Sequence, residues 1–414
     1  MTTLKPLFWS GHDVSEWDAE RHRLAEALAA TPAPGPASEW AAGGFAWVAD
    51  RWNARHRGRG AVRGAVVAGD AATALAALTA ARPVHARRRP VALLFPGQGA
   101  QHTRMAAGLQ GFEPVFTAAM DELFTLLGPD GERTRADWLA AEPKVPVHEV
   151  SRAQPLLLGV GHALARTLIG WGVRPGALLG HSVGETAAAV VARVLSIEDA
   201  VAVIRHRVAA AALQPPGGML AVVAAPDMLA PYLRGPVVVG AVNSPRQTVL
   251  AGPAAELADT AAELREAGFT AVTVPSPLGF HSPAVAGLAD SGLDVFGRVA
   301  LKPPEMPLYS AYTCAPLTAE QAGDPWFWAR QVADPVLFWP ALDRLLTDGD
   351  FLLVEAGPSQ GLVTACRRHR SVIEGRSDVA ALLPARPGPA EADRAALLTA
   401  AARIWTEGHD LTPR

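Results

Sequence analysis

The sequence predicts an α/β protein with a small subdomain inserted into a larger one. The apolar run 91–95 leads into a glycine-rich loop, as a strand of a parallel sheet buried on both faces does. A second apolar run, 177–180, meets Gly-x-Ser-x-Gly and continues as an alanine-rich helix. Residues 219–274 then follow the order β-α-β-β-α-β, which is the ferredoxin-like pattern and predicts the small subdomain.

Composition and charge exclude several classes of protein. The 414 residues are 50% hydrophobic and 19% charged, which indicates two or three compact units and excludes a disordered chain. The net charge of −3 gives no electrostatic footprint for nucleic acid. The two cysteines, Cys314 and Cys366, are too few for a disulfide framework or a thiolate metal cage. We therefore expect no metal site and a cytoplasmic location.

No segment predicts secretion or a membrane span. The first ten residues hold one lysine and only a four-residue apolar cluster, which does not make a signal peptide. The longest apolar segment, 156–173, is interrupted by His162 and Arg166. We interpret it as a buried helix.

The first 89 residues alternate helix and strand signals. A helix is expected over 16–30, and Ser38 can cap a second helix after the proline-rich run 31–36. A strand over 64–69 is followed by Asp70, the predicted cap of a helix over 71–81.

The loop after strand 91–95 is the first candidate site. Glycine-rich loops at the carboxyl ends of parallel strands are where open α/β sheets bind ligands. This loop lacks the Lys and Ser/Thr of a phosphate loop. Gln98, between two glycines, can instead present its amide to a substrate carbonyl.

The strand, sharp turn and helix around Ser182 predict a nucleophile elbow. Gly180 and Gly184 suit this turn, because a Cβ there would meet neighbouring backbone. The amide of Val183, at the start of the helix, is placed to bind an oxyanion. The alternative is a solvent-exposed serine in a glycine-rich turn.

A second Gly-x-Ser-x-Gly stands at 357–361, also after an apolar run. Pro358 fixes its own φ and restricts Gly357, which favours a helix start over a strained elbow. We therefore expect Ser359 to cap a helix over 362–368 and Ser182 to be the nucleophile.

Two long helices are expected on either side of the elbow, over 154–172 and over 197–212, the second capped by Ser196. Arg205 and Arg207 lie about 200° apart around the second helix, so at most one can point into a cleft beside Ser182. Without further information, each of these two arginines is expected to lie on the surface.

The small subdomain ends in a rigid loop, 275–283, which holds His281. A lone loop histidine is usually a solvated group. Strands are then expected over 307–313 and 351–354, and a helix over 336–346 between them. The tail from Pro384 holds a helix over 391–405 and is interpreted as a peripheral wrap or linker.

Five motifs stand in order along the chain: Phe95-Pro96-Gly97-Gln98-Gly99-Ala100-Gln101, Gly180-His181-Ser182-Val183-Gly184-Glu185, Arg207, Phe280-His281-Ser282 and Glu355-Ala356-Gly357-Pro358. Together they resemble the acyltransferase domains of modular polyketide synthases and the malonyl-CoA:acyl carrier protein transacylases of fatty acid synthesis. The resemblance covers nearly the whole chain and implies an α/β-hydrolase-like large subdomain with an inserted ferredoxin-like one.

The resemblance also implies a division of the chain. It makes 1–89 a ketosynthase-to-acyltransferase linker domain, 90–383 the acyltransferase domain (large subdomain 90–215 and 276–383, small subdomain 216–275) and 384–414 a post-acyltransferase linker.

The resemblance implies a Ser-His dyad that lacks an acidic third member, with Ser182 as nucleophile and His281 as general base. A backbone carbonyl orients the histidine in the family, and Leu337 is the expected contributor here. Gln98 and the amide of Val183 correspond to the oxyanion hole.

Arg207 corresponds to the arginine that pairs with the free carboxylate of malonyl groups, since a guanidinium binds a carboxylate through two parallel bonds. Val183 and Phe280 imply malonyl, because the bulky ring fills the space of an α-methyl group. Leu278 and Gly279 depart from the His-Ala that begins the usual malonyl tetrapeptide. A substituted malonyl or carrier-bound acyl group is therefore the alternative.

The implied donor is acyl-coenzyme A, and the implied acceptor is the phosphopantetheine arm of an acyl carrier protein in polyketide biosynthesis, with no permanently bound cofactor. A ketosynthase is a candidate partner through the linker-like regions, whereas nucleic acid and membranes are not expected. Two basic runs, Arg51 to Arg63 and Arg367 to Arg370, are interpreted as solvated surface, although the second is a candidate contact for an acidic carrier.

Three other functions compete with this one. A hydrolase that clears stalled chains would use the same dyad with water as acceptor, but it would be expected to lose the arginine retained at Arg207. A generic esterase is disfavoured because no acid stands between Ser182 and His281 in a clear motif. A non-catalytic docking module is disfavoured by the intact Ser182, His281, Gln98 and Arg207.

Overall fold

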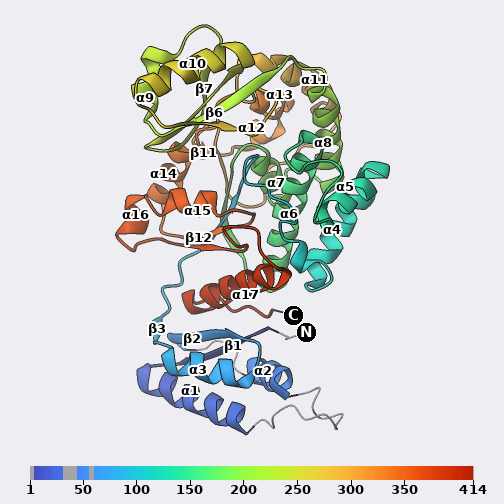
Figure 1. Ribbon diagram of the computed structural model, residues 1–414. Coiled ribbons are helices and arrows are strands. Elements are labelled where there is room, and N and C mark those ends of the chain that lie inside the picture. Colours follow the sequence, from blue (N-terminus) through green and yellow to red (C-terminus); the bar gives the residue numbers. More distant parts are fainter. Residues whose placement is uncertain (1–3, 31–43, 56–59, 414) are drawn as a thin grey trace.

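The computed structural model describes residues 4–30, 44–55 and 60–413, which form three sheets with their own helices (Figure 1). The predicted α/β fold with a small inserted subdomain is confirmed. The proline-rich run 31–36 and the expected cap Ser38 lie outside the described residues.

The central sheet has six strands in the order β11-β10-β5-β4-β12-β13, and all except β11 run parallel. They are β4 (Val91–Phe95), β5 (Pro175–Gly180), β10 (Leu308–Ser310), β11 (Ala315–Pro316), β12 (Leu352–Glu355) and β13 (Asp378–Ala381). In β4, Leu93 and Phe95 pack into the core under the helices of one face, and Ala92 and Leu94 pack into the core of the other. Because both faces are covered, the strand is apolar throughout.

The helices around this sheet come from two parts of the chain. Those before the small subdomain are η1 (Ala107–Leu109), α4 (Pro114–Leu127), α5 (Pro129–Leu139), α6 (Val150–Gly170), α7 (Val183–Val191) and α8 (Ile197–Ala211). Those after it are η3 (Pro283–Val285), α11 (Ala286–Phe296), α12 (Ala319–Gly323), α13 (Pro325–Ala329), η4 (Arg330–Val332), α14 (Phe338–Asp348), α15 (Gly361–Cys366), α16 (Arg370–Ile373) and α17 (Ala390–Glu407).

Helix α6 begins at Val150, four residues before its predicted start, and continues through Pro155. Pro155 cannot donate to the carbonyl of Ser151, one turn earlier. The Nη1 atom of Arg152 donates to that carbonyl instead, at 3.3 Å, so the helix tolerates the proline. Within the described residues, no helix is both long and apolar enough to cross a membrane.

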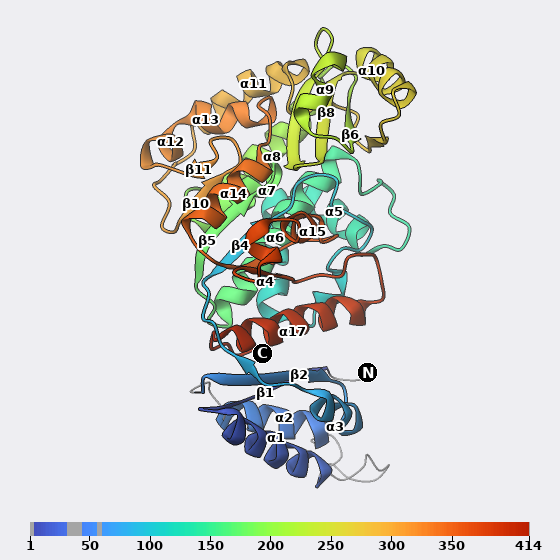
Figure 2. The ribbon, with the colours of Figure 1, turned by 90° about the vertical axis from the view of Figure 1, so that its left-hand side faces the viewer.

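The small subdomain is an antiparallel four-stranded sheet in the order β7-β8-β6-β9, at the top of Figures 1 and 2. Its elements are β6 (Gly217–Val222), α9 (Pro226–Leu229), η2 (Ala230–Tyr232), β7 (Val238–Ser244), β8 (Gln247–Pro253), α10 (Ala254–Glu266) and β9 (Ala271–Val274). This order confirms the predicted ferredoxin-like pattern. Val336, just before α14, exchanges backbone hydrogen bonds with Gly240 and Val242 of β7 and so ties the two subdomains together.

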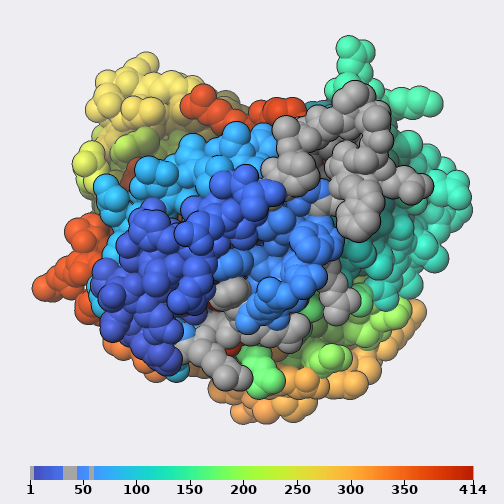
Figure 3. Space-filling view, turned by 90° about the horizontal axis from the view of Figure 1, so that it is seen from below, coloured from blue at the N-terminus to red at the C-terminus, as the bar shows by residue number. Residues whose placement is uncertain are grey.

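The N-terminal domain is a three-stranded antiparallel sheet, β1-β2-β3, with helices on its outer face, and it covers the centre of the lower face in Figure 3. Its elements are β1 (Lys5–Gly11), α1 (Val14–Ala29), α2 (Gly44–Arg55), β2 (Val62–Ala68), α3 (Ala71–Ala80) and β3 (Val84–His85). Asp70 caps α3 through a capping box with Thr73, as predicted for this residue.

Helix α17 fills the space between this N-terminal sheet and the large subdomain (Figures 1 and 2). Side chains alternate across β1, so Leu7 and Trp9 face the helices α1–α3 while Phe8 faces α17 and stacks on Trp405, with ring centroids 4.8 Å apart. Trp405 is 2% exposed. The interpretation of the tail as a peripheral wrap or linker is wrong as to its peripheral position, because α17 is buried between two sheets.

The same interface corrects the interpretation of Arg63 as a solvated residue. Its side chain is 1% exposed and lies over the ring of Trp405, and its Nη1 atom donates to the carbonyls of Trp405 and His409. Its Nη2 atom pairs with Asp410 at 3.1 Å. The sequence could not reveal this role, because the partners lie more than 300 residues away.

Candidate active site

Ser182 sits in the turn between β5 and α7, with φ 54° and ψ −124°. Such backbone angles cost free energy for a residue with a Cβ, and they persist only where the surroundings impose them. The neighbouring glycines allow the turn. A Cβ on Gly180 would lie 2.2 Å from the Cα of Glu185, and one on Gly184 would lie 2.1 Å from the carbonyl oxygen of Phe95.

The side chains of Ser182 and His281 are in direct contact, with 2.7 Å between Oγ and Nε2. The other ring nitrogen of His281, Nδ1, faces two carbonyl oxygens, of Gln331 at 3.1 Å and of Asp334 at 3.0 Å. Carbonyls only accept, so Nδ1 carries the proton and Nε2 is the free acceptor for the serine hydroxyl. This is the tautomer that a general base needs.

Burial keeps this imidazole uncharged. His281 is 4% exposed, and burial, with the neighbouring His181 and Arg207 adding to it, lowers the pKa of His281 to about 3. The residue has φ 64°, and its backbone N–H donates to the carbonyl of Val332. Loop histidines are usually solvated, but His281 is held inside the protein.

The expectation that Leu337 orients the histidine is wrong, although a backbone carbonyl is the right kind of group. The carbonyl of Leu337 accepts from the amide of Ala341, in the first turn of α14. The orienting carbonyls come from Gln331 and Asp334, where the short helix η4 ends and its last carbonyls lack partners within the helix.

Glu185 braces this arrangement, and no pattern in the sequence singled it out for that role. Its carboxyl group is buried and accepts from the amide of Ala311 at 2.9 Å and from Nε2 of Gln331 at 3.2 Å. Burial raises the pKa of Glu185 to about 7. The residue thus links the elbow helix α7 to the segment whose carbonyl faces His281.

Within the described part of the chain, two hydrogen-bond donors near Ser182 lack acceptors: the side-chain amide of Gln98 and the backbone N–H of Val183. The Nε2 atom of Gln98 is buried and has no hydrogen-bond partner among the described residues, while its Oε1 atom accepts from Gln154. Val183 is the first residue of α7, and its backbone N–H has no hydrogen-bond acceptor among the described residues. Donors left open in this way are what an oxyanion would satisfy.

Arg207 is buried and Arg205 is exposed, so the structure separates the two arginines of α8. One guanidinium nitrogen of Arg207 donates to Oε1 of Gln154 at 3.3 Å, and no carboxylate of the described residues pairs with it. Burial lowers the pKa of Arg207. A buried cation of this kind is costly without an anion, which a ligand can provide.

Comparison with known proteins identifies the chain. A family model described as acyl transferase domain matches residues 92–406, which is well over half of the sequence. The chain belongs to this acyl transferase family. It is 35% identical over 330 residues to one component of the phenolphthiocerol/phthiocerol polyketide synthase of Mycobacterium tuberculosis. That alignment covers 78% of this chain and 22% of the relative, so the chain spans less than a quarter of that protein.

Two solved acyl transferase domains have the same fold. The acyl transferase domain of SpnD in complex with 2-(pent-4-yn-1-yl)malonyl is 29% identical, with a TM-score of 0.84 over 98% of this chain and 96% of that one. The acyltransferase domain from module 8 of the salinomycin polyketide synthase is 26% identical, with a TM-score of 0.82 over 99% of this chain and 97% of that one. The protein is thus an acyltransferase similar to those of modular polyketide synthases.

Packing explains the residues found in the segment before His281, which departs from the tetrapeptide expected for malonyl. Leu278 and Phe280 are each 5% exposed and lie in a core with Leu288. A Cβ on Gly279 would lie 2.6 Å from the carbonyl oxygen of Gly252 in β8. An alanine at 279 would therefore require β8 to move.

Ser359, the serine of the second Gly-x-Ser-x-Gly, takes no part in the dyad of this acyl transferase domain. The prediction that it caps α15 is wrong, because Gln360 occupies that position. Both residues have positive φ, 73° and 55°, and the turn directs the Ser359 hydroxyl to the carbonyl of Ala100, at 2.5 Å.

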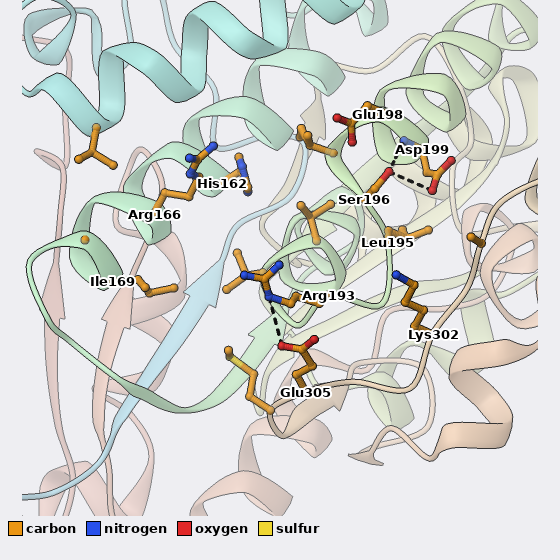
Figure 4. Close-up of a pocket in the computed structure, with 17 residues that line it drawn as sticks. His162, Arg166, Ile169, Arg193, Leu195, Ser196, Glu198, Asp199, Lys302 and Glu305 are labelled. Carbon is orange, nitrogen blue, oxygen red and sulfur yellow. Dashed lines mark hydrogen bonds and ion pairs between the residues drawn. The ribbon is translucent and has the colours of Figure 1, made fainter.

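A cavity of about 760 Å³ lies away from the dyad, between the end of α6 and the start of α8 (Figure 4). None of the predicted site residues lines it. Its lining is balanced in charge, and in Figure 4 Arg193 pairs with Glu305. The other charged residues of the lining are Arg166, Lys302, Glu198 and Asp199. Such a lining gives no net attraction for a carboxylate, so this cavity is not the candidate acyl site.

Proposed function

We propose that this acyltransferase moves a malonyl group from coenzyme A to the phosphopantetheine thiol of an acyl carrier protein. The observation that supports it best is the pairing of the Ser182–His281 contact with the buried Arg207, which has no carboxylate partner among the described residues. The first provides a nucleophile and the second a counter-charge for an acyl group that carries a free carboxylate.

The proposed reaction has two half-reactions. The Ser182 hydroxyl attacks the thioester carbonyl and gives its proton to Nε2 of His281, while the amides of Gln98 and Val183 bind the oxyanion. The C–S bond then breaks, and coenzyme A leaves as a thiol with the proton from His281. In the second half-reaction the carrier thiol gives its proton to His281 and attacks the ester, and Ser182 recovers the proton as it leaves.

Basic side chains near the dyad support an acidic carrier as the partner. Arg368 lies 3.5 Å from the Ser244 hydroxyl, and Asn243, the residue before it, binds the ring of His181 next to the nucleophile. Arg367 and Arg246 are exposed close to these positions in the chain, and neither has an ion-pair partner among the described residues. We propose this group, Arg246, Arg367 and Arg368, as the docking surface for the carrier.

The division of the chain fits the same proposal. We propose residues 1–89 and 384–414 as linker regions on either side of the acyltransferase domain, with a large subdomain over 90–215 and 276–383 and a small one over 216–275. The packing of α17 between the N-terminal sheet and the large subdomain supports this, because it makes the two linker regions one structural unit.

The proposal is tested by intact mass after incubation with a panel of acyl-CoA thioesters, with and without a carrier protein. We expect malonyl to be loaded preferentially and passed to the carrier. Ser182→Ala should carry no acyl group, and Ser359→Ala, the matched control in the second motif, should load like the wild type. Preferential loading of methylmalonyl or of an uncharged acyl group would contradict the malonyl assignment, and rapid release of free malonate would favour the hydrolase.

A further inference from the structure

Tyr312 is a polar side chain in the candidate site that no sequence motif marked. It follows β10, which pairs with β5 in parallel, Leu308 opposite Leu178. The carboxyl ends of parallel neighbours meet at one edge of the sheet, so the turn after β10 emerges beside the turn that carries Ser182. The ring centroids of Tyr312 and His281 are 6.4 Å apart.

The backbone on both sides of Tyr312 is fixed. The amide of Ala311 donates to Glu185 at 2.9 Å, and its carbonyl accepts from the amide of Leu337 at 2.7 Å. The amide of Tyr312 donates to the Ser310 hydroxyl at 3.1 Å, and the amide of Cys314 donates to the Ser310 carbonyl. The ring is therefore presented to the site from a rigid turn and not from a free loop.

The phenol ring lies beside the dyad, and its hydroxyl interacts with both groups that an acyl chain would connect, Ser182 and Arg207. The phenol hydroxyl is within hydrogen-bonding reach of the Ser182 hydroxyl and close enough to Arg207 for each charge to affect the other's pKa. Burial raises the pKa of Tyr312, so the phenol keeps its proton and is a donor at neutral pH. Since the Ser182 hydroxyl donates to His281, the lone pairs on its oxygen are available to accept from the phenol in the unacylated enzyme.

We propose that Tyr312 and Arg207 together form the receptor for the free carboxylate of the acyl group, with the Tyr312 hydroxyl as a donor to that carboxylate. This rests on the proposed function of Ser182 and extends it. Acylation converts the Ser182 oxygen into an ester oxygen, which is a poorer acceptor. The phenol then takes the carboxylate as its acceptor, and a charged acceptor makes the stronger hydrogen bond.

The test compares Tyr312→Phe with Tyr309→Phe. Tyr309 lies three residues earlier and donates to Asp348 outside the site, so it controls for loss of a tyrosine hydroxyl. Both variants and the wild type are incubated with malonyl-CoA and with acetyl-CoA, which has no free carboxylate, and kcat/KM for acyl-enzyme formation is measured. We expect Tyr312→Phe to lower kcat/KM for malonyl-CoA about tenfold and leave that for acetyl-CoA unchanged, with Tyr309→Phe changing neither.

An equal loss with both thioesters would overturn the proposal, because it would mean that the phenol acts on Ser182 and not on the carboxylate. Unchanged kinetics with malonyl-CoA would overturn it as well. Failure of the wild type to form any acyl-enzyme would instead refute the proposed function, so the two failures are distinguishable.

Discussion

The large subdomain has two interfaces, and they treat buried polar groups in opposite ways. Where the N-terminal sheet and α17 meet the large subdomain, Arg89 binds Glu407 of α17 through two hydrogen bonds of 2.8 and 2.7 Å, and both side chains are buried. Arg89 also donates to the carbonyl of Arg376 in the large subdomain. Towards the small subdomain, Arg207 is buried with a single amide contact, and Nε2 of Gln98 has no partner among the described residues. The Arg89–Glu407 pair is complete as it stands, although Nε1 of Trp405 in the same interface has no partner among the described residues. The second interface leaves a buried guanidinium and a side-chain amide that a ligand can use.

The difference follows from what each interface does. Burial alone would raise the pKa of Glu407, but the guanidinium groups of Arg89 and Arg403 outweigh it and hold that pKa below its ordinary value. At the other interface, the dyad is assembled from the elbow of the large subdomain and the loop that leaves the small one. Free donors there cost stability, which is the usual condition of a site prepared for a transition state.

The largest effect on stability is expected from Glu407→Ala, which leaves Arg89 buried without its main partner. We expect the free energy of unfolding to fall by about 4 kcal/mol, because an uncompensated buried charge remains. Chemical denaturation measures it. Arg133→Ala, which removes an exposed pair with Asp130, is the control and should change stability by less than about 1 kcal/mol. A drop in the acylation rate of the folded variant would show that this interface is not purely structural.

At the interface with the small subdomain, Gln98→Ala should lower the catalytic rate and leave stability unchanged, which is the reverse of the effect of Glu407→Ala. We expect kcat to fall about 100-fold, corresponding to about 3 kcal/mol of lost oxyanion stabilisation, with no loss in the free energy of unfolding. Single-turnover acylation measured by intact mass gives the rate. Gln110→Ala is the matched control, since that amide binds Asp121 and lies outside the site. Equal kinetics for the two variants would remove Gln98 from the oxyanion hole.

The smallest effect on the acylation rate is expected from pH. A base with a pKa of about 3 stays neutral, so the acylation rate should be nearly constant between about pH 5 and 8. Stability behaves differently. The folded pKa lies below the unfolded value of 6.5, so the stability held by the neutral His281 is complete above about pH 6.5 and is lost as pH falls towards 3. A rate that halves near pH 6.5 while the protein stays folded would contradict the burial of this imidazole.

Local patterns predicted local structure well. The strand 91–95, the elbow at Ser182 and the order of the small subdomain follow from apolar runs, glycines and helix caps, and the structure has them. These features depend on neighbours a few residues away, which is the distance over which sequence periodicity carries information.

Apart from two local boundaries, the start of α6 and the cap of α15, the errors and omissions involve partners far along the chain. The carbonyls that face His281 depend on where η4 ends, 50 residues later, so Leu337 could not be distinguished from Gln331 and Asp334. Tyr312 reaches the site only because β10 pairs with β5. The position of Tyr312 after an apolar strand could have marked it as a candidate site residue. The sequence does not show, however, that this strand lies next to the one that carries Ser182.

The stacking of Phe8 on Trp405 has a consequence for synthesis. The first strand cannot complete its packing until a side chain 397 positions later has left the ribosome, which takes ~20–80 s at ordinary rates of translation. Until then, one face of a nascent sheet stays uncovered. The early part of this polypeptide must therefore wait, exposed to chaperones and proteases, for the helix that closes it.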